Sequence, residues 1–312
     1  MSFNQYTWDL YKQTTIGIEM IKYFSDAGGY VLFKDYCPYA NFIPEDLYND
    51  WLENIYCYGV SDYDHPSSLE EAKDLYISLI TLGIRVEGQQ WLPANDFKNM
   101  LGIIQPMSYV LSQFAPEYFF PYLFLCRIFE LNKIADFFNI DLPNIPKRTD
   151  YKGRCMYYWE LCEVFYLFRK ENGLSPADLW SFLYDFAPNN LPSEKIDMPK
   201  PSQVWFIGGR LYQEDKSLES KFWQSSPETK KGDILVHYET SPISAITCIE
   251  ISLTDGVIDP LFRYYGCIYI GNRINIPHIT LKELQTDEYF FKHPLVRKNF
   301  QGVNGWSVNS EN

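Results

Sequence analysis

Apolar residues recur at intervals of three and four positions over residues 1–190, which predicts helices that pack through one face. Residues 67–84 (SSLEEAKDLYISLITLGI) illustrate the pattern, because Ser67 or Ser68 can cap a helix while a glutamate of the first turn returns the hydrogen bond. Residues 140–153 (IDLPNIPKRTDYKG) break the pattern with two prolines and several turn residues, so we expect a connector between two groups of helices.

A second capped helix is predicted over residues 173–188 (GLSPADLWSFLYDFAP). Ser175 is a suitable N-cap, Pro176 fits the first turn, and Pro188 is expected to end the helix. Its apolar positions are expected in the core, namely Trp180, Phe182, Leu183 and Phe186.

The pattern changes after a proline-rich stretch, which we interpret as a linker over residues 191–203. Short segments rich in β-branched and aromatic residues follow, separated by Gly, Asp, Ser or Pro, and they predict the strands of a small barrel. The chain is therefore predicted to be an α+β protein, with an all-helical domain over residues 1–190 and a mixed β-barrel over residues 204–312. The expected strands are QVWFIG, DILVHY, ISAITCIEISLT and LFRYYGCIYI, and a capping box at Thr280 and Glu283 predicts a short helix after them.

Composition fits a folded protein, since 46% of the 312 residues are hydrophobic and 18% are aromatic. The net charge of −13 opposes long-range attraction to nucleic acid. Residues 201–312 contain 11 Lys and Arg against 13 Asp and Glu, so nearly all of the negative charge precedes them. The C-terminal part can therefore meet phosphates at a few points, whereas the acidic helical part is better suited to a partner protein.

Several observations restrict the compartment and the chemistry. No apolar run reaches the roughly 18 residues of a membrane helix, and the N-terminus lacks a basic leader, so we expect a cytoplasmic protein without a membrane partner. Seven scattered cysteines are expected to be reduced, packed thiols. The four histidines show no metal-site or catalytic spacing, and no phosphate-binding glycine loop occurs, so we expect no enzyme, metal or cofactor.

Flat rings and a few polar groups in the C-terminal part could form a pocket for an extruded base. Trp223 lies in a polar loop and is expected to be accessible, whereas Trp205 alternates with apolar residues and is expected in the core. His237 should face away from its neighbour Tyr238, in a packing or surface role. The candidate pocket residues are Trp223, Tyr238, Ser241, Tyr264 and Asn304, and the candidate phosphate contacts are Lys230, Lys231 and Arg263.

Residues 205–308 resemble the EVE family, which is related to the PUA and YTH domains. The matching features are Trp205, Trp223, the Lys231-Gly232-Asp233 turn before an apolar strand, Tyr238 followed by Ser241, and the returning strand SAITCIEI. The resemblance implies a barrel whose aromatic pocket accepts a modified base of DNA or RNA. Gln224-Ser225-Ser226 replaces an Arg-Asn pair that is usual in the family, which leaves the kind of base open.

The helical part resembles segments of bacterial defence and restriction proteins, through YFFPYLFL, IDLPNIPK and the residues from Glu160 to Phe186. Together the resemblances imply a non-enzymatic reader of a modified base that serves as an anti-phage or restriction accessory factor. A protein-interaction subunit without a nucleic-acid ligand is an alternative. A magnesium-dependent nuclease is another, built on Glu219-Ser220-Lys221 or Asp150-Tyr151-Lys152, although such triplets arise by chance in charged loops.

Overall fold

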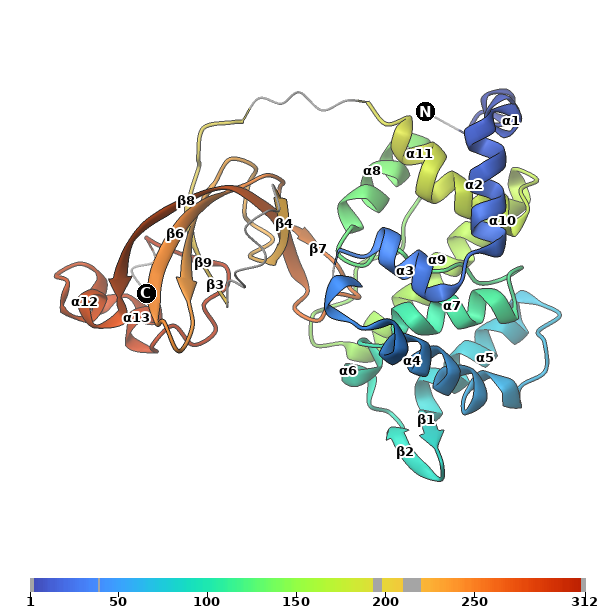
Figure 1. The fold of residues 1–312 in the computed structure, drawn as a ribbon, viewed down its shortest axis with the longest axis horizontal. Helices are drawn as coiled ribbons and strands as arrows, with labels where there is room; N and C mark the ends of the chain where they lie inside the picture. Colours follow the sequence, from blue (N-terminus) through green and yellow to red (C-terminus); the bar gives the residue numbers. More distant parts are fainter. Residues whose placement is uncertain (1–2, 39, 193–197, 210–219, 310–312) are drawn as a thin grey trace. The chain divides into compact units, whose positions relative to one another are not determined.

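The computed structural model describes residues 3–38, 40–192, 198–209 and 220–309 and divides the chain into two compact units (Figure 1). The helical unit comprises Met1–Ser193 together with Pro260–Arg263, and the sheet unit comprises Glu194–Asp259 and Tyr264–Asn312. The α+β class is confirmed. The predicted linker over residues 191–203 falls where the units divide, and its residues 193–197 lie outside the described residues.

The sequence predicted an all-helical domain over residues 1–190, but the helical unit also contains two strands. Strands β1 (Ile84–Val86) and β2 (Gln89–Leu92) form an antiparallel hairpin between two of its helices. Gly88 adopts a φ of 78° at the turn, which a residue with a side chain rarely adopts. The helices are α1 (Gln5–Gln13), α2 (Thr15–Asp26), α3 (Gly29–Tyr36), α4 (Glu45–Cys57), α5 (Leu69–Leu82), α6 (Phe97–Met100), α7 (Ile104–Phe114), α8 (Ile128–Phe138), α9 (Tyr151–Glu171), α10 (Pro176–Ser181) and α11 (Ala187–Asn189), with 3-10 turns at Ala40–Phe42 and Val60–Asp62.

The predicted helix caps are confirmed. Ser68 accepts a hydrogen bond from the Glu71 backbone at the start of α5, and Ser175 forms a reciprocal capping box with Asp178 at the start of α10. The helical path after α10 continues through a π-helical segment, Phe182–Phe186, into α11 and therefore ends one residue beyond Pro188. The four predicted core residues of this region are all buried.

Residues 119–124 form a buried segment without regular secondary structure inside the helical unit, where its backbone groups need partners other than water. Tyrosine hydroxyls supply several of them. Tyr184 donates to the Pro121 carbonyl at 2.5 Å and accepts from the Leu123 N–H at 3.2 Å, and Tyr158 donates to the Phe120 carbonyl at 2.8 Å. The many tyrosines of this unit therefore stabilise a core that contains irregular backbone.

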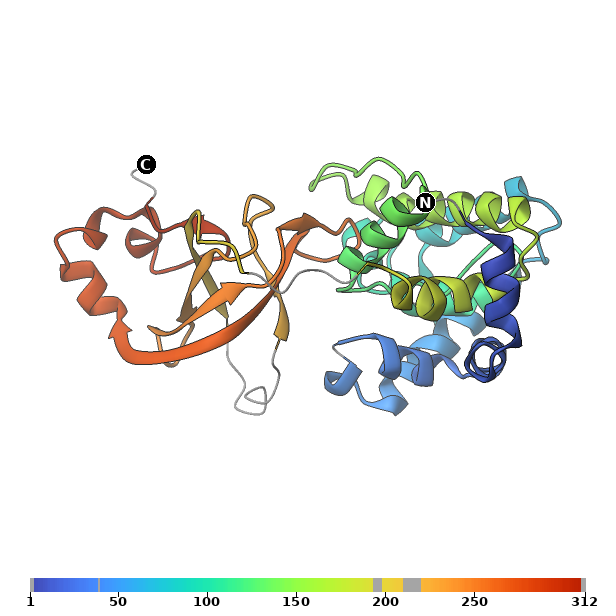
Figure 2. The same ribbon diagram turned by 90° about the horizontal axis from the view of Figure 1, so that it is seen from above.

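The sheet unit is a curled mixed sheet with strand order β4-β8-β6-β5-β3-β9, and β7 pairs with β8. Neighbouring strands are antiparallel except β3 and β5, which are parallel. Strand β8 bends along its length toward α12, as Figure 2 shows. The strands are β3 (Val204–Gly209), β4 (Ser220–Gln224), β5 (Ile234–Glu239), β6 (Ala245–Ser252), β7 (Val257–Ile258), β8 (Gly266–Thr280) and β9 (Trp306–Ser307), and the helices are α12 (Leu281–Thr286) and α13 (Pro294–Arg297), with a 3-10 turn at Phe290–Lys292 between them.

The last predicted strand, residues 261–270, is shifted in the structure to β8, which begins at Gly266. Tyr265 has a φ of 78°, which interrupts an extended backbone. The preceding segment, Pro260–Arg263, belongs to the helical unit. There the buried guanidinium of Arg154 donates to the carbonyls of Pro260 at 2.7 Å and Phe262 at 2.6 Å.

The two faces of the curled sheet have separate apolar cores. One contains Phe206, Tyr238 and Phe300 and is completed by residues of α12 and α13. The other contains Trp205 and Ile268, against which Trp223 packs. No helix among the described residues combines the length and the hydropathy needed to cross a bilayer.

Candidate functional site

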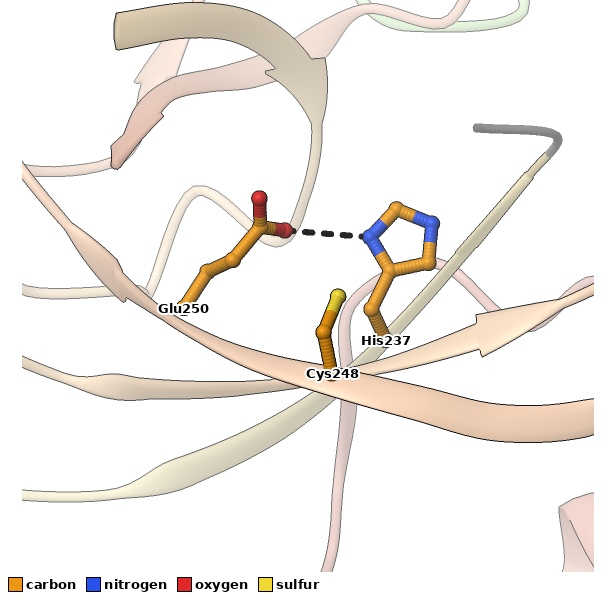
Figure 3. A group of neighbouring side chains, drawn as sticks. All are labelled: His237, Cys248 and Glu250. Carbon is orange, nitrogen blue, oxygen red and sulfur yellow. Dashed lines mark hydrogen bonds and ion pairs between the residues drawn. The ribbon is translucent and has the colours of Figure 1, made fainter. Parts of the chain in front are cut away.

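Three chemically active side chains meet on one face of the sheet, where strand alternation brings them together. His237 on β5 pairs in register with Cys248 on β6, and Glu250 lies two residues farther along β6. The three side chains point to the same side (Figure 3). Their possible ligand atoms all lie within 4.8 Å of one another, and the residues are 0%, 0% and 2% exposed.

Register irregularities surround this cluster. One lies between His237 and Tyr238 in the β5–β6 pair, and the β6–β8 pair has others between Ile246 and Cys248 and between Ile249 and Ile251. Such bulges twist a strand locally and change the direction of its side chains, and they are common beside functional sites. Glu250 contacts both neighbouring strands, β5 through His237 and β8 through Arg273.

Glu250 is the centre of a buried hydrogen-bond network. Its Oε1 accepts from Nε and Nη2 of Arg273 at 2.8 and 2.7 Å, and its Oε2 lies 3.1 Å from Nδ1 of His237. Burial alone would raise the pKa of Glu250, but the hydrogen bonds from His237 and Arg273, together with the charge of Arg273, outweigh burial and lower it. Glu250 is therefore an ionised acceptor, and the Nδ1–H group of His237 donates the hydrogen bond to it.

The other nitrogen of His237, Nε2, is buried and has no hydrogen-bond partner among the described residues. The imidazole meets the half-buried ring of Trp223 edge to face, with 4.9 Å between the ring centroids. Gly209 on β3 lies beneath that indole, so close that a Cβ there would stand 2.7 Å from Cζ2 of Trp223. The site thus combines a fixed imidazole, an unsatisfied nitrogen and an aromatic ring positioned by a glycine.

Nucleophilic chemistry does not fit this environment. Burial raises the pKa of the Cys248 thiol to about 11, aided by the charge of Glu250, although Arg273 acts in the opposite direction. A reactive cysteine needs a lowered pKa, because the thiolate is the nucleophile. Cys248 is therefore a neutral, packed thiol.

The same three residues could also hold a metal ion, since a histidine, a thiolate and a carboxylate are zinc ligands. The charges around the cluster favour the hydrogen-bonded arrangement over a bound metal ion. Glu250 and Arg273 already neutralise each other, and a divalent ion would have to break the bond between His237 and Glu250 and deprotonate the Cys248 thiol close to a guanidinium. We therefore interpret the cluster as a buried hydrogen-bond network.

The predicted pocket residues do not converge on one cavity. Trp223 packs on the face that holds His237, whereas Tyr238 lies in the opposite core, 3% exposed and stacked on Phe300 with 4.0 Å between the centroids. Alternation along β5 separates the two candidate walls. Asn304 accepts from the Gly208 N–H at 2.8 Å and donates to Gln224 at 3.1 Å, so it joins the β9 turn to β3 and β4.

The other predicted contacts are dispersed. Ser241 lies in the exposed turn between β5 and β6, and Tyr264 is 46% exposed before β8. Lys230 and Lys231 lie in the loop before β5, where their backbone N–H groups bind Asp233 and Asp255. Arg263 lies in the segment that belongs to the helical unit.

Of the two nuclease triplets, the structure describes the one that begins at Asp150. Asp150 caps α9 by accepting the Gly153 N–H at 2.9 Å, which is a structural role. Glu219 lies outside the described residues.

The sequence interpretation missed His237, Glu250 and Arg273 as a group. One available signal was the short turn between the segments DILVHY and SAITCIEI, because a hairpin there pairs His237 with the region of Cys248 and Glu250. The position of Arg273 had no such signal, since β8 contains Gly, Asn and Pro and extends beyond the predicted strand.

Comparisons with known proteins add little to this geometry. No protein-family model matches the chain, and no curated protein matches it. Among solved structures, the NMR structure of Rpa0253 from Rhodopseudomonas palustris is 13% identical, with a TM-score of 0.30, and the match covers 34% of this chain and 86% of that one. This TM-score is too low to indicate a shared fold, and the EVE resemblance stays a prediction.

Proposed function

We propose that the chain is a non-enzymatic binding protein whose sheet unit reads a modified base in DNA or RNA. The observation that carries this proposal is the buried imidazole of His237, whose Nδ1 bonds to Glu250 and whose Nε2, beside Trp223, has no partner within the described parts of the chain. An unsatisfied buried polar atom destabilises a fold by about 1–3 kcal/mol, which a ligand that bonds to it would recover.

The chemistry of the site favours a ligand with an N–H donor and a flat face. Nδ1 of His237 donates to Glu250, and when the ring is neutral its Nε2 is a hydrogen-bond acceptor. Amino and ring N–H groups on the Watson–Crick edges of nucleobases are suitable donors. Stacking on an aromatic ring such as Trp223 contributes roughly 1–3 kcal/mol per base.

The charge distribution is compatible with such a reader. The part after residue 200 is nearly neutral, so phosphate contacts are few and unmodified nucleic acid should bind weakly. Specificity would then come from the base site. The acidic helical unit would dock a partner protein that performs the chemistry, in keeping with an accessory role in bacterial defence or restriction.

The test is binding of the full chain to oligonucleotides that carry one methylated, hydroxymethylated or glucosylated base, followed by fluorescence anisotropy at two salt concentrations. A reader binds at least one modified oligonucleotide more tightly than its unmodified counterpart, and affinity falls as salt rises. His237→Gln and Trp223→Ala should each weaken that binding about tenfold or more.

Matched controls come from the same chain. His278 is exposed on β8 and Trp91 is half-buried on β2, so His278→Gln and Trp91→Ala make the same chemical changes away from the site. Both should retain full affinity, and thermal melting of all four variants confirms that they are folded. If no oligonucleotide binds at either salt concentration, the protein-interaction subunit becomes the better interpretation.

A further inference from the structure

A cavity of about 500 Å³ lies in the helical unit, at the place where helices α4 and α5 end and strand β1 begins. Its volume falls within the roughly 300–1,000 Å³ that is typical of sites for small molecules. The wall combines apolar and aromatic side chains with one basic and one acidic group. Its lining includes Tyr58, Tyr63, Leu79, Leu82, Arg85 and Asp62.

The guanidinium of Arg85 is oriented by the amide of Gln90. The two residues pair in register across the β1–β2 hairpin, and Nε of Arg85 donates to Oε1 of Gln90 at 3.2 Å. Nε2 of Gln90 donates in turn to the carbonyls of Ile84 at 3.3 Å and Leu92 at 2.6 Å, which fixes the amide. Arg85 is exposed, and its Nη1 and Nη2 have no partner in the part of the chain that the structure describes. These two nitrogens can therefore bind a carboxylate through two parallel hydrogen bonds.

The opposite end of a ligand would meet negative charge. Asp62 ends the 3-10 turn Val60–Asp62, is exposed, and within the described residues accepts no hydrogen bond and forms no ion pair, not even with Arg85. The C-cap residues of α4 and α5, Tyr58 and Gly83, both line the cavity, and neither helix has a basic residue in its last turn. Because the C-terminal end of a helix favours a positive group, the helix ends and Asp62 together favour a cation.

The remaining wall suits an apolar body. Leu79 is 2% exposed, whereas Leu82 is 62% and Tyr58 41% exposed, and Tyr63 is half-buried. A ligand that covers the exposed side chains removes their apolar surface from water, which favours binding. The cavity therefore offers separate places for an anion, a cation and an apolar group.

We propose that this cavity binds a free α-amino acid with an apolar side chain. Arg85 binds the α-carboxylate, Asp62 and the helix ends attract the α-ammonium group, and the leucine and tyrosine side chains cover the apolar part. Such a zwitterion has no net charge, so the net charge of −13 on the chain does not repel it as it would repel an anion. The proposal goes beyond base recognition, because every group in it belongs to the helical unit.

Cys57 provides a measurement inside the cavity. It lines the cavity and is exposed, whereas the other six cysteines are buried. L-Phenylalanine is titrated into the full chain by calorimetry, and the rate at which N-ethylmaleimide alkylates Cys57 is followed by mass spectrometry of the peptide that contains it. Phenylalanine is expected to bind and to slow the alkylation of Cys57 in proportion to its occupancy.

Two analogues separate the charges of the probe. N-Acetyl-L-phenylalanine lacks the ammonium group, and L-phenylalaninamide lacks the carboxylate. Each should bind at least about tenfold more weakly than phenylalanine, because each loses one charge-assisted contact. Glycine keeps both charges without an apolar side chain and should also bind more weakly.

Two variants assign the charges to residues. Arg85→Gln should weaken phenylalanine and its N-acetyl form about tenfold while the affinity for phenylalaninamide is unchanged. Asp62→Asn should weaken phenylalanine and phenylalaninamide and leave the N-acetyl form unchanged. Arg297→Gln and Asp50→Asn make the same changes at exposed positions outside the cavity and should bind as the wild type does. Thermal melting of the four variants checks that they are folded.

Three results would overturn the proposal. One is that phenylalanine neither binds nor protects Cys57 at tens of millimolar. Another is that either analogue binds as tightly as phenylalanine. The third is that Arg85→Gln or Asp62→Asn, with an unchanged melting temperature, keeps full affinity for phenylalanine or weakens all three ligands equally. Each result leaves the base-reading proposal unaffected, because oligonucleotide binding is measured separately.

Discussion

The indole nitrogen of Trp205 donates a hydrogen bond of 2.9 Å to Oδ2 of Asp233, a carboxylate with no exposed surface. Asp233 also accepts from the backbone N–H groups of Ser202, Gln203 and Lys230, at 2.9, 3.0 and 2.9 Å, and from the Ser202 hydroxyl at 2.7 Å. One side chain thus joins the start of β3 to the loop before β5, and it does so in its ionised form.

The ionisation of Asp233 should make the free energy of unfolding depend on pH in the acid range. Burial alone would raise its pKa, but the hydrogen bonds from Lys230, Trp205 and Ser202 outweigh burial and lower it. A carboxyl whose pKa is lower in the folded state contributes its full stability above its unfolded pKa of about 3.9 and loses it as pH falls below that value. We therefore expect the unfolding free energy of the wild type to fall more steeply below about pH 4 than that of Asp233→Asn.

Urea unfolding of both proteins between neutral and acid pH measures this difference. At neutral pH, Asp233→Asn should be less stable by about 1–3 kcal/mol, because an amide cannot accept all of these bonds. Asp255→Asn is the control, since Asp255 is exposed and accepts one backbone bond, from Lys231. If the unfolding free energies of the wild type and Asp233→Asn changed with pH in parallel, Asp233 would not be the source of the acid sensitivity.

Tyr184→Phe should destabilise the helical unit without changing its shape. The substitution removes the hydroxyl that serves the Pro121 carbonyl and the Leu123 N–H, and leaves two buried backbone groups without that partner. The expected loss is about 1–3 kcal/mol in chemical unfolding. Tyr6→Phe is the control, because Tyr6 is 73% exposed and its change should be neutral. Equal stability of the two variants would show that the hydroxyl of Tyr184 contributes little.

Local patterns predicted much of the fold. Ser68, Ser175 and Thr280 each start a helix as their sequences predict, because caps depend on neighbours within one turn. The strand that starts at Gly266 was misplaced, because its course depends on Arg154, which holds Pro260–Arg263 in the helical unit and is distant in sequence.

The candidate site was harder to predict than the fold. Trp223 and Tyr238 both resemble pocket residues in sequence, yet they pack on opposite faces of the sheet. The grouping of His237 with Glu250 and Arg273 requires the register of three strands and several bulges, which depend on the whole sheet. Composition and spacing carry no such information.

Gly209→Ala should disturb the proposed base site without touching a polar group. A Cβ at position 209 would stand 2.7 Å from the Trp223 ring, closer than carbon atoms approach, so the indole must move. Since that ring is the proposed stacking surface, we expect affinity for the preferred modified oligonucleotide to fall about tenfold, which is within the range for loss of one stacking contact. A change in tryptophan fluorescence should accompany the loss. Gly28→Ala is the control, because a Cβ at Gly28 meets no atom within 4 Å. If Gly209→Ala shifts the fluorescence and retains full affinity, Trp223 does not contact the base.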